Sequence, residues 1–142
     1  RIHFVQKYLK DLGNLVFHGT MSQSAIHGKL SEFDVGLAIE NRETDNNRNI
    51  CLTNKIWAYL QSGLYILASD TDAQNGFLTE NEWAGKIVVQ KEIAWRESLL
   101  QAIRNQEEIR SEAILRFHKA QQFRWENESK KIKLVIDSLT HK

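Results

Sequence analysis

The chain has 142 residues and a mass of 16.5 kDa, which suits one domain, and its 42% hydrophobic residues supply a core and exclude wholesale disorder. Nineteen basic residues nearly cancel eighteen acidic ones, so the net charge of +1 gives no strong field for nucleic acid, and we expect no nucleic-acid partner. Because apolar runs last only a few residues, we expect no transmembrane segment. A single cysteine excludes an internal disulfide framework.

The first forty residues alternate between helical and strand patterns. Apolar residues at helical spacing predict a helix over residues 2–12, and the apolar run at 15–18 predicts a short buried strand. Ser22 or Ser24 can cap a second helix. A further apolar run predicts a strand over residues 35–39.

A polar stretch then separates this strand from the next helix. Residues 40–50, ENRETDNNRNI, are too polar for a core and predict an exposed loop. Thr53 is predicted to cap a helix that ends at Gly63. The almost entirely apolar run at 64–69 is typical of a strand covered on both faces. We expect residues 70–83 to form a loop with at most one helical turn.

Residues 86–89 predict a last strand, and three helical patterns follow it. Strands that alternate with helices indicate an α/β fold with a parallel sheet. We therefore expect one domain over residues 1–142, with an α/β core over about 1–90 and a helical tail over about 91–142. The tail is expected to pack on one side of the sheet or to reach another domain. Because the chain begins with Arg1 inside a helical pattern, we interpret it as a piece of a longer protein.

The junction between the polar loop and its helix is the first candidate site. Thr53 and Asn54 bring a hydroxyl and an amide to a helix start that follows the carboxyl end of a strand, and Lys55 adds a positive charge. Free N–H groups, the helix dipole and a cation are what a diphosphate requires. An ordinary helix cap with a solvated lysine is the alternative.

The polar loop is the second candidate. Carboxylates and amides from Glu40 to Asn49 could bind the hydroxyl groups of a sugar or ribose, and a solvated loop is the alternative. Their spacing does not match an EF-hand, and we expect no metal. His18 and Gly19 follow a predicted strand, where the histidine could act as a base or donate to a ligand; a structural histidine is the alternative.

The motifs FHG at 17–19, FDVGLAIE at 33–40 and TNKIWAYLQSGLYILASDT at 53–71 resemble the C-terminal half of a GT-B glycosyltransferase of the group 1, or family 4, type. The resemblance covers about residues 10 to 90 well. It covers the tail more loosely, where the helix that begins near Trp125 is similar to the closing helix of that family.

The resemblance implies a Rossmann-like domain that binds a nucleotide-diphosphate sugar as substrate and needs no cofactor. Thr53, Asn54 and Lys55 would face the phosphates, Glu40 and residues 41–49 would border the sugar or ribose, and His18 and Gly19 would join the substrate site. The implied partners are the nucleotide-sugar donor and a missing N-terminal acceptor domain. The implied location is cytoplasmic, with peripheral attachment to the inner face of the membrane left open.

The chain departs from the family pattern at Ala58, where members often carry a glutamate that binds ribose. Either the contact with the donor is altered, another group such as Glu40 takes its place, or catalysis has been lost. The expected function is therefore the donor-binding half of a glycosyltransferase, inactive as a fragment. The alternative is a catalytically silent GT-B-like binding or assembly module. A flavodoxin-like signalling domain is disfavoured because the expected acidic cluster at the strand ends is lacking.

Overall fold

A computed structural model describes Val16, residues 18–41, Glu43 and residues 46–140. The elements follow in the order α2 (Gln23–Leu30), β1 (Val35–Ala38), α3 (Asn46–Ile50), α4 (Asn54–Gln61), β2 (Tyr65–Ser69), α5 (Asp72–Glu80), η1 (Glu82–Ala84), β3 (Gly85–Val88), α6 (Glu92–Arg104), α7 (Gln106–Ser111), α8 (Ala113–Ala120), η2 (Gln121–Phe123) and α9 (Trp125–Thr140).

The three described strands form a parallel sheet in the order β1-β2-β3. Leu37 of β1 pairs with Leu67 of β2, and Ala68 of β2 pairs with Ile87 of β3. The central strand β2 is buried from its second residue to its last, as its apolar sequence predicts for a strand covered on both faces. The structure thus confirms an α/β fold with a parallel sheet flanked by helices.

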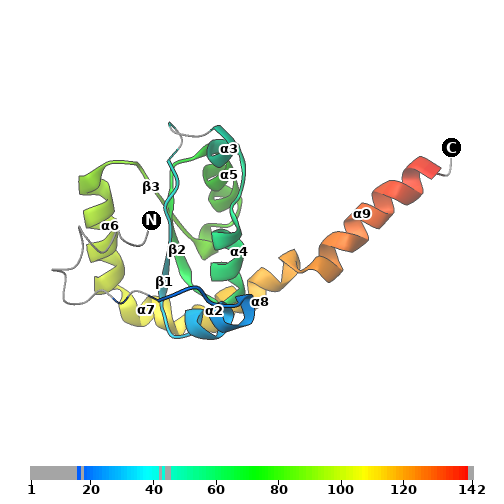
Figure 1. Cartoon of the computed structure of the whole chain (residues 1–142). Coiled ribbons are helices and arrows are strands. Elements are labelled where there is room, and N and C mark those ends of the chain that lie inside the picture. Colours follow the sequence, from blue (N-terminus) through cyan, green and yellow to red (C-terminus); the bar gives the residue numbers. More distant parts are fainter. Residues whose placement is uncertain (1–15, 17, 42, 44–45, 141–142) are drawn as a thin grey trace.

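Helices cover both faces of the sheet (Figure 1). On one face α4 and α5 enclose a core with β2, to which Ile56, Leu60 and Leu78 contribute. The rings of Trp57 in α4 and Phe77 in α5 extend this core, with their centroids 5.5 Å apart. On the other face α6 and α7 pack over β2 and β3 through a second cluster: Leu67, Val88, Ala102 and Ile109.

The expectation of a loop over residues 70–83 is wrong, because α5 occupies most of it. The Thr71 hydroxyl caps this helix by accepting a hydrogen bond from the Gln74 backbone N–H at 3.4 Å. Asp72 in the first turn complements the helix dipole. Gly76 suggests a break, but it lies on the exposed side of the helix and is tolerated there.

The expectation of an exposed loop over residues 40–50 also needs correction. Its last five residues form α3, which contacts α5. Its first residue, Glu40, is only 4% exposed. The helix predicted over 2–12 lies outside the described residues, as do Leu15 and Phe17; Val16 and His18 belong to no strand.

The predicted helical tail forms α6 to α9. Its first helices pack on the domain, whereas α9 projects away from it (Figure 1). Every residue from 131 to 140 is exposed, including the apolar Leu134 and Leu139 at 70% each. Within the part of the chain that the structure describes, no helix combines the length and the apolar character needed to cross a membrane.

Candidate functional site

Glu40 lies at the carboxyl edge of the sheet, two residues beyond the end of β1. Its backbone N–H donates to the Ser69 hydroxyl at 2.9 Å, which ties the end of β1 to the end of β2. The Glu40 side chain is 3% exposed. A carboxylate this deeply buried requires cationic or hydrogen-bonding partners, because burial alone strongly disfavours its charged form.

Two cations supply those partners. The Lys55 ammonium lies 2.6 Å from Glu40 Oε1, and an Arg48 guanidinium nitrogen lies 3.4 Å from Glu40 Oε2. Lys55 also donates to the Ile39 carbonyl at 3.2 Å. The Lys55 and Arg48 side chains are 44% and 45% exposed, so each cation reaches from the buried carboxylate into solvent. The edge of the sheet therefore presents a buried anion beneath two accessible cations.

The start of α4 lies beside this group. Thr53 occupies the N-cap position in an extended conformation, but its side chain makes no capping hydrogen bond. Its Oγ1 atom is buried and has no hydrogen-bond partner among the described residues. Thr53 thus occupies the predicted N-cap position, but the prediction that it caps the helix is wrong for its hydroxyl, which makes no capping hydrogen bond. Asn54, the first residue of α4, is exposed.

The start of α5 borders the same edge. The Asn49 side-chain nitrogen donates to the Asp72 carboxylate at 2.7 Å, and the Asp72 backbone N–H donates to the Asn49 side-chain oxygen Oδ1 at 3.1 Å. This pair of hydrogen bonds, called here the Asn49–Asp72 clasp, holds α3 against α5. Near the clasp, Gln74 is completely buried, and neither polar atom of its side chain has a partner among the described residues.

The structure brings four of the six predicted site residues together at the carboxyl edge: Glu40, Thr53, Asn54 and Lys55. His18 and Gly19 are exposed, and no hydrogen bond or ion pair among the described residues joins them to this group. Comparison with protein-family models, curated proteins and solved structures found no match to this chain.

The sequence prediction does not single out three further residues: Arg48, Ser69 and Gln74. Ser69 is the one polar side chain at the end of an apolar strand, which marks it as a candidate. Gln74 stands four residues before Leu78, on the face of α5 that enters the core. Arg48 is one charge among several in a polar loop, and only the fold shows that it reaches Glu40.

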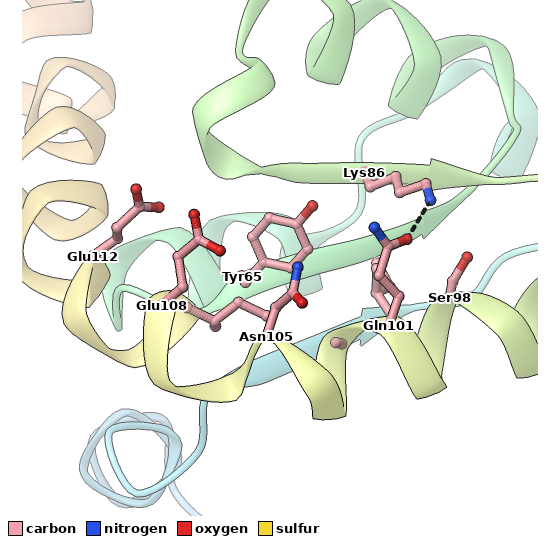
Figure 2. A pocket seen from close by; sticks show the side chains of 10 residues that line it. Tyr65, Lys86, Ser98, Gln101, Asn105, Glu108 and Glu112 are labelled. Atoms are coloured by element: carbon pink, nitrogen blue, oxygen red, sulfur yellow. Dashed lines mark hydrogen bonds between the residues drawn. The ribbon is translucent and has the colours of Figure 1, made fainter.

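A groove of about 180 Å³ lies elsewhere, on the face covered by α6 and α7 (Figure 2). Tyr65 at the start of β2 and Lys86 in β3 contribute to its walls, and Lys86 donates to the Gln101 side chain at 3.0 Å. Burial raises the pKa of the Tyr65 phenol. The groove includes none of the six predicted residues and lies toward the amino end of β2. We therefore place the candidate site at the carboxyl edge, where a buried carboxylate is paired with two partly exposed cations.

Proposed function

We propose that this chain is the nucleotide-sugar-binding half of a glycosyltransferase, with a Rossmann-like GT-B fold, that transfers a sugar from a nucleotide-diphosphate donor to an acceptor. The observation that carries the proposal is the Lys55–Glu40 pair beside the start of α4. Open α/β sheets bind their ligands at the carboxyl ends of their strands, and a helix start there favours an anion. The resemblance at residues 33–40 and 53–71 points to the same place.

Lys55 is suited to contact the donor diphosphate. An ammonium has three N–H donors, and the Glu40 carboxylate and the Ile39 carbonyl account for two of them. The third is available for a phosphate oxygen. Glu40 holds the cations at the edge of the sheet and offers carboxylate oxygens to a ribose or sugar hydroxyl. In this role it would replace the glutamate that the family carries where this chain has Ala58.

The proposed chemistry of this half is electrostatic. When the bond between the sugar and the diphosphate breaks, negative charge grows on the departing phosphate, and a lysine near a helix start stabilises that charge. The acceptor and its activation belong to the missing N-terminal domain, so the chain alone is expected to bind the donor without transferring the sugar. The proposal places the protein in the cytoplasm and leaves peripheral membrane attachment open.

Thermal unfolding in the presence of nucleotide sugars tests the proposal. A ligand that binds only the folded chain stabilises it by about 2.7 kcal/mol at a concentration one hundred times its Kd. We expect a UDP-sugar or a GDP-sugar to raise the Tm of the chain. The same ligand should raise the Tm of Lys86→Ala equally, because Lys86 lies in the groove on the other face. If no nucleotide sugar shifts the Tm, the donor-binding role is wrong.

The alternative function is a catalytically silent GT-B-like binding or assembly module. Two observations favour it. Ala58 removes the family's ribose-binding glutamate, and Glu40 already neutralises Lys55 within the protein. In that case the exposed apolar side chains of α9 would contact a partner in an assembly rather than the N-terminal domain of a glycosyltransferase. The same thermal measurement separates the two functions, because a silent module that has lost its donor site shows no response to nucleotide sugars.

A further inference from the structure

Gln74 is the polar residue that the packing of the domain explains least. Its side chain is 0% exposed, and both its amide nitrogen and its amide oxygen lack hydrogen-bond partners among the described residues. Buried polar side chains in native proteins are normally hydrogen-bonded, because an unpaired buried group carries its full desolvation cost. A glutamine kept in the core without a protein partner therefore points to a partner from outside the chain.

Gln74 lies near the start of α5. It shares a helix face with Leu78, which lies in the core, and side chains on a helix tilt toward its amino end. Both α4 and α5 follow strands of one parallel sheet, so both helices start at the carboxyl edge. Trp57 of α4 touches Phe77 of α5, and Thr53 and Gln74 each lie about one turn nearer that edge.

Thr53 repeats the same anomaly on the neighbouring helix. Its hydroxyl is buried and has no partner among the described residues, and it does not cap α4. Two unpaired polar side chains thus lie at the starts of two helices: Thr53 is two residues from Lys55, and Gln74 follows the strand whose last residue, Ser69, accepts from the Glu40 backbone N–H. This placement puts both side chains at the edge of the sheet where the donor site is proposed.

The chemistry of the two side chains limits what they can bind. An amide nitrogen donates and an amide oxygen accepts, and a hydroxyl does both. A diphosphate has no N–H or O–H group when it is fully ionised, so it can satisfy the nitrogen of Gln74 but not its oxygen. A sugar ring carries neighbouring hydroxyl groups that donate and accept, and these can satisfy both ends of the amide.

We infer that Gln74, together with Thr53, binds the hydroxyl groups of a sugar ring in the donor and so determines specificity for the sugar-bearing part of the ligand rather than for the diphosphate. This inference rests on the proposed function. The ring is either the ribose of the nucleotide or the sugar that is transferred. Because Gln74 is completely buried, a ligand reaches it only if the packing around it opens, and we expect the Asn49–Asp72 clasp, two residues away at the start of α5, to part.

The test compares the wild-type chain with Gln74→Leu, with Gln101→Leu as the control in the opposite groove. The Kd values for UDP, UDP-glucose and GDP-mannose are measured by titration calorimetry, and the Tm is measured without ligand. We expect Gln74→Leu to weaken binding of the preferred nucleotide sugar at least tenfold, with an unliganded Tm that is unchanged or higher. A higher Tm would follow from removing an unpaired buried amide. Gln101→Leu should leave the Kd unchanged.

The outcomes separate the inference from the function on which it rests. Equal weakening for UDP and for the nucleotide sugar assigns the ring to ribose, and weakening for the nucleotide sugar alone assigns it to the transferred sugar. If the wild-type chain binds a nucleotide sugar and Gln74→Leu binds it equally well, the inference is wrong and the proposed function stands. A clear fall in the unliganded Tm of Gln74→Leu also overturns the inference, because it shows that the amide already has a partner. If the wild-type chain binds none of the ligands, both fail.

Discussion

The carboxylate of Asp34 and the guanidinium of Arg110 form a two-point ion pair although they lie 76 residues apart in sequence. Arg110 Nε donates to one carboxylate oxygen at 3.0 Å, and a terminal guanidinium nitrogen donates to the other at 2.8 Å. The Gln106 side chain adds a third hydrogen bond at 3.0 Å. Because Asp34 immediately precedes β1, these contacts fix the strand that leads to Glu40 against α7.

This ion pair predicts that the folded chain loses stability as the pH falls. The hydrogen bonds from Arg110 and then Gln106 lower the pKa of Asp34 below its ordinary value of 3.8. A carboxyl group with a lower pKa in the folded state contributes stability above its unfolded pKa and loses it as the pH falls through the folded value. Urea midpoints of wild type and Asp34→Asn should therefore differ at pH 6 and converge below about pH 3.8. The difference should be modest, because Arg110 is largely exposed and solvent screens the pair. A difference that persists unchanged in strong acid would contradict this prediction.

Alanine substitutions at two glycines are expected to change the folding free energy in opposite directions. A Cβ atom on Gly36 in β1 would lie 2.5 Å from ring atoms of Tyr59, whose hydroxyl donates to the Leu37 carbonyl. We expect Gly36→Ala to cost about 1–3 kcal/mol of folding free energy through overpacking. Gly76, within α5, has nothing within 4 Å of its added Cβ, so Gly76→Ala should stabilise by about 0.5–1 kcal/mol. Urea denaturation of both variants measures the change in the free energy of unfolding. A Gly36→Ala variant as stable as wild type would show that the Tyr59 ring moves aside freely.

A buried arginine ties α8 to the turn before β2. Arg116 is 2% exposed; its Nε donates to the Gly63 carbonyl at 3.0 Å, and another nitrogen donates to the Ile109 carbonyl. Replacing it with methionine keeps much of the volume but leaves both carbonyls without this donor. We expect Arg116→Met to lower the free energy of unfolding by about 1–3 kcal/mol. The exposed Arg104, substituted in the same way, is the control, and equal urea midpoints for the two variants would refute the anchoring role.

The sequence predicts the elements whose patterns are purely apolar and misses what depends on long-range contacts. The run that forms β2 is recognisable because both its faces are buried. The helix α5 is not recognisable, since its sequence is polar, contains Gly76, and has only Leu78 as a fully buried apolar residue. Its start depends on the Thr71 hydroxyl, a local signal that could have been read as a helix cap.

Burial of the candidate site is the part that the sequence could not predict. Glu40 reads as a loop residue, and it is buried because the fold brings Lys55, Arg48 and Ser69 to it from three separate segments. The same holds for the Asn49–Asp72 clasp, whose partners are 23 residues apart. The sequence predicts that Lys55 is available for a phosphate. In the structure its ammonium already pairs with a carboxylate of the protein, Glu40.

The pairing of Lys55 with Glu40 predicts that substitution of either residue weakens binding of the donor. Lys55→Ala should weaken UDP binding by about 1–3 kcal/mol, the scale of a charge-assisted hydrogen bond. Glu40→Gln keeps the size of the side chain but removes the charge that holds Lys55 and that is proposed to bind the ribose, so UDP should bind more weakly. Calorimetric titration of both variants, with Lys86→Ala as the control, measures the difference. An unchanged Kd for Lys55→Ala would remove the lysine from the site. Tighter UDP binding by Glu40→Gln would mean that the carboxylate competes with the phosphate for Lys55 rather than positioning it.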